Sequence, residues 1–208
     1  MHTFFIGLLV FTSVVALTFI VERGLALRWN RIIPPPLQTG VGLYKSAADL
    51  PGLQKLCEQH PSTCSRLVLF ATNHLEGSRS ESSALLETRA RHEVAQLERG
   101  LVVLEIIIGI APLLGLVGTI YGLITLFGSM NAVAGVDSVK FSQGVSLALN
   151  ATLLGLLVAI PAVVSWSYYS KKVENLTVEM ETICDEFLRR HYRSANGEST
   201  ASGSVKRA

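Results

Sequence analysis

The segment "APLLGLVGTIYG", residues 111–122, lies within a run of sequence, 106–136, that has no charged side chain. It places one proline, four alanines or glycines and a single threonine in an otherwise strongly apolar setting. Proline and glycine weaken an isolated helix, so their presence here needs a reason in packing or in function. Two further uncharged runs, 4–21 and 141–170, lie on either side of it. Since about 20 apolar residues cross a hydrocarbon core, the three runs predict three transmembrane helices.

The composition is that of a membrane protein rather than a soluble domain. Of the 208 residues, 49% are hydrophobic and 16% are charged, and the mean hydropathy is +0.41. Soluble domains carry about 25% charged residues, so the apolar excess must be covered by lipid or by other helices. We therefore expect an all-α membrane protein, because helices satisfy their own backbone hydrogen bonds in the bilayer.

The distribution of basic residues predicts the orientation. Residues 22–100 hold ten Lys or Arg and residues 171–208 hold seven, whereas 1–3 and 137–140 together hold one. Because basic residues near the span ends stay in the cytoplasm, we expect the N-terminus outside and the C-terminus inside. The net charge of +2 then reflects topology and gives no reason to expect nucleic-acid binding. No Lys or Arg precedes the first run and no small-x-small site follows it, which favours a retained helix over a signal peptide.

These spans predict the organisation of the chain. We expect a first transmembrane helix at 1–21, a helical cytoplasmic loop at 22–100, a second transmembrane helix at 101–130, a short periplasmic loop at 131–140, a third transmembrane helix at 141–170, a cytoplasmic helix at 171–193 and a disordered tail at 194–208. Pro34, Pro35 and Pro36 predict an extended break, and residues 45–80 predict two short helices. From Glu81 onward only Gly100 interrupts the helical pattern, so one helix is expected to rise from the cytoplasm into the second span.

The third helix is also expected to continue below the membrane. Apolar residues recur at spacings of three and four after its uncharged run: Val173, Leu176, Met180, Ile183 and Phe187. This spacing predicts a buried seam against other helices. The second and third helices together therefore predict a long helical bundle in the cytoplasm.

The cysteines give no sign of a disulfide framework or a metal centre. All three fall in segments assigned to the cytoplasm, where thiols stay reduced. Cys57, His60, Cys64 and His74 could be drawn as a cluster, but the cysteine spacing is too wide for a zinc knuckle. We expect no metal and no cofactor.

Small residues follow one face of each of the last two spans. In the second span this face holds Ala111, Gly115 and Thr119, flanked by Gly118 and Gly122. In the third span it holds Ala148, Thr152, Gly155 and Ala159. Small residues at this spacing let membrane helices approach closely, so close packing is the simplest interpretation of the glycines and alanines.

The two threonines on these faces suggest more than packing. The separation along the chain from Arg99 to Thr119 nearly equals the separation from Thr152 to Lys171. Antiparallel helices therefore bring both hydroxyls to nearly one depth. A threonine hydroxyl can also bond to its own helix without further meaning. One chain's two hydroxyls cannot enclose a polar path, so a closed ring of identical subunits is the economical hypothesis.

The two prolines also approach a common level. Pro112 follows Arg99 at a separation similar to that by which Pro161 precedes Lys171. Each frees a backbone carbonyl four positions earlier in its helix. The common level of the two prolines favours a polar ring that the prolines shape. The alternative is that polar groups lie on separate helices without a common role.

Glu105 is the only carboxylate near the membrane part of the second helix. Its 14-residue separation from Thr119 turns it within about 40° of the same face, about 21 Å away. It is a candidate for a cytoplasmic exit of the ion path, and the alternative is a headgroup-level residue paired with Arg99. The uncharged runs 106–136 and 141–170 contain no carboxylate and no histidine, so the acid of any proton path must come from another polypeptide.

Two segments carry a family resemblance. They are "RGLVVLEIIIGIAPLLGLVGTIYGLI" (99–124) and "GVSLALNATLLGLLVAIPAVVSWSYYSKKVENL" (144–176). With their prolines and threonines in this order they resemble the MotA/TolQ/ExbB proton-channel family, and most closely its ExbB/TolQ branch. Many members of that branch carry a glutamate five positions before the third-span threonine, and here Leu147 stands there. That carboxylate is then either dispensable or replaced in its role by Glu105.

The resemblance implies a homopentamer in the bacterial inner membrane whose second and third helices line a lumen. Inside it, Thr119 and Thr152 would face the aspartate of an ExbD-like or TolR-like single-span partner, and Pro112 and Pro161 would shape the helices. A TonB-like protein would deliver the force to outer-membrane nutrient uptake. The alternatives are a TolQ-like subunit that acts with a TolA-like protein in outer-membrane maintenance, or a passive membrane scaffold. An enzyme is not expected, because no His, Cys or carboxylate constellation shares one depth.

Overall fold

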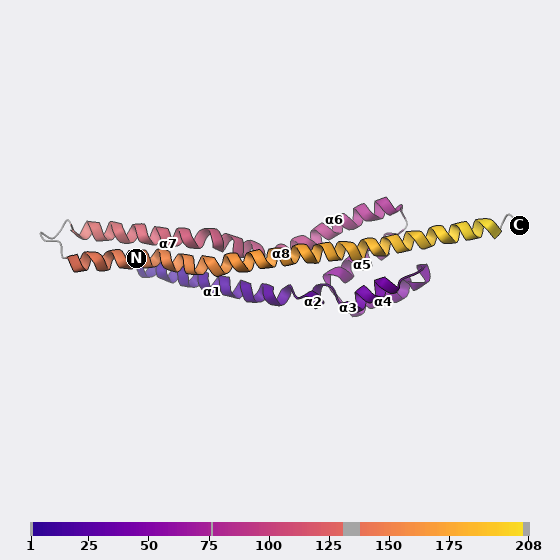
Figure 1. The fold of residues 1–208 in the computed structure, drawn as a ribbon, viewed down its shortest axis with the longest axis horizontal. Coiled ribbons are helices and arrows are strands. Elements are labelled where there is room, and N and C mark those ends of the chain that lie inside the picture. Colours follow the sequence, from indigo (N-terminus) through magenta and orange to yellow (C-terminus); the bar gives the residue numbers. More distant parts are fainter. Residues whose placement is uncertain (1, 76, 131–137, 206–208) are drawn as a thin grey trace. The chain divides into compact units, whose positions relative to one another are not determined.

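The computed structural model describes residues 2–75, 77–130 and 138–205, and every regular element among them is a helix (Figure 1). In chain order these are α1 (His2–Ala26), α2 (Trp29–Ile32), α3 (Pro35–Leu43), the 3-10 helix η1 (Ala47–Asp49), α4 (Leu50–Gln59), α5 (Thr63–Thr72), α6 (Arg79–Glu98), α7 (Leu101–Met130) and α8 (Ser138–Val205). The expectation of an all-helical chain is confirmed for these residues.

Three helices are long and apolar enough to cross a membrane. The qualifying stretches are Phe4–Ala26 in α1, Leu101–Gly128 in α7 and Phe141–Ser194 in α8. The three predicted spans therefore correspond to three candidate membrane helices. The N-out orientation and the pentameric ring remain predictions.

The chain forms two compact units. The first consists of Met1–Leu25 and Arg99–Ser170, and the second consists of Ala26–Glu98 and Lys171–Ala208. Helix α8 contributes its N-terminal part to the first unit and its C-terminal part to the second. Each unit has its own buried side chains and is described in turn.

The first unit packs α1, α7 and the N-terminal part of α8 through small side chains. Its core cluster consists of Ala16, Ile107, Ala111, Ala159 and Ala162. Most large apolar side chains of these helices point outward instead, as Ile124 (64% exposed) and Val164 (62%) do. Such a surface is unfavourable in water and suited to lipid or to neighbouring helices.

The second unit is a bundle of short helices packed on the C-terminal part of α8. All five residues of the predicted seam, from Val173 to Phe187, are buried. The Phe187 ring lies 5.1 Å from the ring of Tyr44, which ends α3. The Tyr44 hydroxyl lies 2.8 Å from His191 Nδ1, so a polar contact closes the same corner.

The predicted single helix through Gly100 is wrong, because α6 ends at Glu98 and α7 begins at Leu101. The Arg23 side chain crosses Gly100 so closely that a Cβ there would overlap its guanidinium. Glycine also has the weakest intrinsic helix propensity apart from proline. The Arg23 side chain of α1 therefore occupies the place that a side chain at position 100 would fill.

The first helix is longer than the predicted span at 1–21, since α1 continues to Ala26. Glu22 and Arg23 lie within this helix, and the exposed Glu22 and the half-buried Arg23 form an ion pair of 2.6 Å. Charged residues mark the edge of the apolar region without ending the helix.

The proline run at 34–36 breaks the chain less than predicted, because only Pro34 is extended (φ −65°, ψ 133°) while Pro35 and Pro36 form the first residues of α3. Proline is tolerated in the first turn of a helix, where its missing N–H has no partner to lose.

Residues 45–80 contain η1, α4, α5 and the first residues of α6. The Ser62 hydroxyl caps α5 by accepting a hydrogen bond from the Ser65 N–H at 3.0 Å. Most of the predicted loop at 131–140 lies outside the described residues, and α8 begins at Ser138. Helix α8 continues to Val205, through most of the segment for which the composition predicts disorder. That segment contains no proline that would end the helix.

Candidate functional site

Helices α7 and α8 approach each other closely at glycines. A Cβ on Gly115 would lie 2.8 Å from the Ala151 carbonyl oxygen, and a Cβ on Gly155 would lie 2.6 Å from the Ala111 carbonyl oxygen. Both neighbours are backbone atoms, which cannot move aside as a flexible side chain can. The two positions therefore require glycine at this helix separation.

Two further glycines of α7 extend this contact. A Cβ on Gly118 would lie 2.9 Å from the Ala151 Cβ, and a Cβ on Gly122 would lie 2.9 Å from the Ala148 Cβ. The structure thus brings the predicted small-residue faces together: Gly115, Gly118, Gly122, Ala148 and Gly155. These side-by-side helices are visible in Figure 1.

The two threonine hydroxyls meet inside this contact. Thr119 and Thr152 are hydrogen-bonded to each other through their Oγ1 atoms. The Thr119 Oγ1 also lies 3.1 Å from the Gly115 carbonyl oxygen of its own helix and 3.2 Å from the Ala148 carbonyl oxygen of α8. The Thr152 Oγ1 lies 3.3 Å from the Gly115 carbonyl oxygen. Thr119 and Thr152 therefore lie at one level along α7 and α8, as their similar separations from Arg99 and Lys171 predict.

The hydroxyls of Thr119 and Thr152 have two protons to donate. More oxygen acceptors lie within hydrogen-bond distance than these two protons can serve. One hydroxyl donates to the other, and the second donates to a backbone carbonyl. Either threonine can take either role, because Gly115 O lies within reach of both hydroxyls. Thr119 is buried and Thr152 is half-buried, so Thr152 is the member more open to a partner.

The prolines lie at a second common level. Pro112 follows Ala111, and Pro161 lies between Ala159 and Ala162, and these three alanines pack in one cluster. Both prolines are internal to continuous helices. Each leaves the carbonyl four positions earlier without its usual helical donor, at Ile108 and Leu157.

Glu105 does not join the threonine pair. It lies on an exposed face of α7, beside the buried Leu104. Within the described ranges no ion pair joins it to Arg99 or to any other residue. The structure therefore leaves this carboxylate free to face lipid, a lumen or a neighbouring subunit.

A contact that fastens α1 to α8 was missed by the sequence analysis. The Tyr169 hydroxyl donates a hydrogen bond to the Ile20 carbonyl oxygen at 2.9 Å. Gly24 makes room for it, because a Cβ there would lie 2.9 Å from the tyrosine oxygen. A glycine in the last turns of an apolar helix was the only sequence signal.

A buried carboxylate in the second unit was also missed. Glu93 on α6 is 1% exposed and accepts hydrogen bonds from Arg66 Nε at 3.0 Å and Arg89 at 2.8 Å. Glu93 continues the spacing of three and four set by the buried Leu86 and Ala90. That periodicity was the available signal, although a carboxylate is normally assigned to a solvated face.

The three cysteines are buried as free thiols in the second unit. Burial raises the pKa of Cys57 to about 11 and the pKa of Cys64 to about 12. Burial also raises the pKa of Cys184 well above its ordinary value. The neutral thiols pack as small apolar side chains, and no group of three metal-ligating side chains forms among the residues that were placed.

The fold and this site define a class: a helical membrane protein whose last two candidate spans pack closely around paired hydroxyls. Residues 61–182 match the MotA/TolQ/ExbB proton channel family, and this range covers α5, α6, α7 and the described membrane part of α8. The chain belongs to this family.

Individual relatives indicate the branch of the family to which the chain belongs. An ExbB-like biopolymer transport protein of Synechocystis sp. is 34% identical over 157 residues, which is 73% of this chain and 61% of that protein. The biopolymer transport protein ExbB of Helicobacter pylori is 38% identical over 81 residues, 39% of this chain and 56% of that protein. The Tol-Pal system protein TolQ of Pseudomonas aeruginosa is 29% identical over 193 residues, 86% of this chain and 82% of that protein. These relatives place the chain in the ExbB/TolQ branch without separating ExbB from TolQ.

Proposed function

We propose that the chain is the pore-forming subunit of a proton-driven, energy-transducing motor in the bacterial inner membrane. Five copies would surround an ExbD-like single-span partner whose membrane aspartate carries the proton. A TonB-like protein would pass the resulting motion to outer-membrane nutrient uptake. The observation that carries this proposal is the hydrogen-bonded pair of Thr119 and Thr152 between closely packed α7 and α8.

The pair suits a carboxylate that comes from outside this chain. Runs 106–136 and 141–170 contain no Asp, Glu, His, Lys or Arg, and a threonine hydroxyl does not titrate near neutral pH. An ionised carboxylate in an apolar environment needs hydrogen-bond donors. Thr152 can turn its hydroxyl toward such a group while Thr119 still donates to a backbone carbonyl. When the partner is protonated or absent, Thr152 returns to Gly115 or Thr119, so no buried hydroxyl loses its hydrogen bond.

A TolQ-like role is the second candidate. The TolQ relative aligns with 86% of this chain, more than the ExbB-named relatives described above. The same pore chemistry would then act with a TolA-like protein in envelope maintenance. Deletion of the gene distinguishes the two, since a TonB-linked subunit is needed for growth on scarce outer-membrane-imported nutrients, and a TolA-linked subunit for resistance to detergents.

Removal of the Thr152 hydroxyl tests the proposal against a passive scaffold. We expect Thr152→Val to lower proton flux in vesicles that contain the chain and its partner by about ten- to a hundredfold, because a hydrogen bond to a charged group contributes about 1.5–3 kcal/mol. Thr152→Ser keeps the hydroxyl and should retain most of the flux.

Thr125→Val is the matched control in α7. The Thr125 hydroxyl is exposed and bonds back to the Tyr121 carbonyl oxygen of its own helix at 2.9 Å, so its loss should leave the flux unchanged. If Thr152→Val assembles with the partner and conducts protons like the unaltered chain, the scaffold hypothesis is favoured and the proposed role of the pair is wrong.

A further inference from the structure

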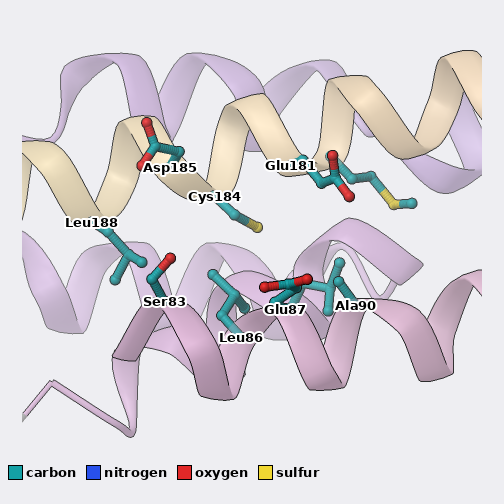
Figure 2. Close-up of a pocket in the computed structure, with 10 residues that line it drawn as sticks. Ser83, Leu86, Glu87, Ala90, Glu181, Cys184, Asp185 and Leu188 are labelled. Carbon is teal, nitrogen blue, oxygen red and sulfur yellow. The ribbon is translucent and has the colours of Figure 1, made fainter. Parts of the chain in front are cut away.

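The second unit contains a cavity of about 280 Å³ between α6 and the C-terminal part of α8 (Figure 2). We call it the α6–α8 groove. Its floor is apolar and is formed by Leu67, Leu86, Ala90, Met180, Cys184 and Leu188. Figure 2 shows Leu86 and Ala90 of α6 across the cavity from Cys184 and Leu188 of α8. This volume accommodates side chains of a partner rather than a whole helix.

The rim of the groove is acidic. Glu87 lies on α6, and Glu181 and Asp185 lie on α8, and all three are exposed. Glu87 pairs with Arg91 at 2.7 Å and Asp185 pairs with Arg79 at 2.9 Å. Both pairs are exposed, so each contributes little and can exchange partners. In the part of the chain that the structure describes, no ion pair involves Glu181.

We propose that the α6–α8 groove docks the cytoplasmic flank of the single-span partner, through apolar side chains in the groove and Lys or Arg on its rim. The assignment rests on the proposed function, which requires such a partner. Cytoplasmic flanks of membrane helices are enriched in Lys and Arg close to the span. A basic segment with interspersed apolar residues is therefore the chemistry that both the partner supplies and the groove fits.

The groove lies within reach of such a flank. Lys171 directly follows the uncharged run of α8, and Glu181 lies ten residues further along the same helix. At 1.5 Å per residue this is about 15 Å along the helix axis. An extended chain advances about 3.3 Å per residue, so about five residues of a partner would cover the same axial distance. Docking in the α6–α8 groove would tie the partner to the second unit while the partner's span stays in the membrane.

Peptide binding tests the chemistry of the groove. The full chain in detergent is titrated with a short labelled peptide of leucine and lysine, and with its leucine and glutamate counterpart. We expect the basic peptide to bind more tightly, and Glu87→Gln with Glu181→Gln to raise its Kd by about two- to thirtyfold, because each of the two exposed ion pairs contributes up to about 1 kcal/mol. Glu58→Gln with Glu98→Gln removes the same charge from exposed positions outside the groove and should leave the Kd unchanged. Equal Kd values for the two double variants would overturn the proposal.

Cross-linking identifies the occupant. A photoreactive benzoylphenylalanine replaces Ser83, which lines the groove, or Thr88, an exposed residue of α6 outside it. Irradiation of the assembled complex should join the Ser83 variant, and not the Thr88 variant, to a Lys- or Arg-rich segment next to the partner's span. Cross-links from Ser83 only to a second copy of this chain would overturn the proposal, and so would their absence while the partner co-purifies. Absence of any single-span partner from the purified complex would instead count against the proposed function as well.

Discussion

At the scale of single residues, the glycines of α7 and α8, which have no side chain, matter as much as the threonine hydroxyls. The hydroxyls of Thr119 and Thr152 meet because Gly115 and Gly155 let two backbones approach to contact distance. A bulkier residue at either glycine would separate the helices and pull the two hydroxyls apart. Polar chemistry at this depth therefore depends on neighbouring positions that carry no functional group.

Gly155→Ala tests that dependence. Its Cβ would lie 2.6 Å from the Ala111 carbonyl oxygen, so the helices must shift, at a cost of about 1–3 kcal/mol. We expect a lower thermal unfolding temperature in detergent and reduced proton flux. Gly109→Ala is the control in α7, because a Cβ there meets nothing within 4 Å. Equal unfolding temperatures for the two variants would show that α7 and α8 do not depend on this contact.

His191 makes the stability of the second unit depend on pH. Burial lowers the pKa of His191 below its ordinary value of 6.5. The unfolded chain therefore binds this proton at a higher pH than the folded chain does, so stability is fully present above about pH 6.5 and falls as the pH drops below it. The second unit should unfold at lower denaturant concentration at pH 5.5 than at pH 7.5.

Trp29 fluorescence in a Trp166→Phe background reports this unfolding, because Trp29 belongs to the second unit. His191→Gln removes the group that titrates and should flatten the pH dependence between these values. An unchanged slope in His191→Gln would assign the effect to other groups.

At the scale of helices, a buried ion cluster fixes α5 to α6. Glu93 lies between Arg66 of α5 and Arg89 of α6 and is almost fully buried. Glu93→Gln leaves both arginines without their anion, and we expect the free energy of unfolding of the second unit to fall by about 1–3 kcal/mol. Glu87→Gln breaks only an exposed pair one turn apart and should cost about 0.5 kcal/mol or less. Denaturant unfolding followed by Trp29 compares the two, and equal losses would contradict the assigned burial of Glu93.

Sequence periodicity and charge predicted these helices well where local rules decide the outcome. The uncharged runs located the candidate spans, and the distances of Thr119 and Thr152 from flanking basic residues predicted their meeting. The break at Gly100 was not predictable in this way, since one glycine inside a helical pattern is usually tolerated and the Arg23 side chain that lies over Gly100 comes from a helix remote in sequence. Glu93 was missed for a similar reason, because its burial depends on Arg66 from another helix.

At the scale of the whole molecule, the exposed apolar surface of the first unit has to be covered by lipid or by other protein. The first unit exposes large apolar side chains on all three of its helices, among them Phe11, Leu113 and Leu153. Lipid or other subunits must cover them, and a homopentamer around a partner helix would use part of this area. No sequence rule for a single chain predicts which of these faces meets lipid and which meets a neighbour, because both environments select the same apolar residues.

A high-resolution cryo-EM map of the complex purified with its partner tests the central claim most directly. The measured quantity is the distance from Thr152 Oγ1 to the nearest carboxylate of a helix on the symmetry axis. We expect five copies of the chain and a distance in at least one of them within hydrogen-bond range, below about 3.5 Å. Thr152 turned toward lipid in every copy, or an axis without an acidic helix, would contradict the proposed proton path.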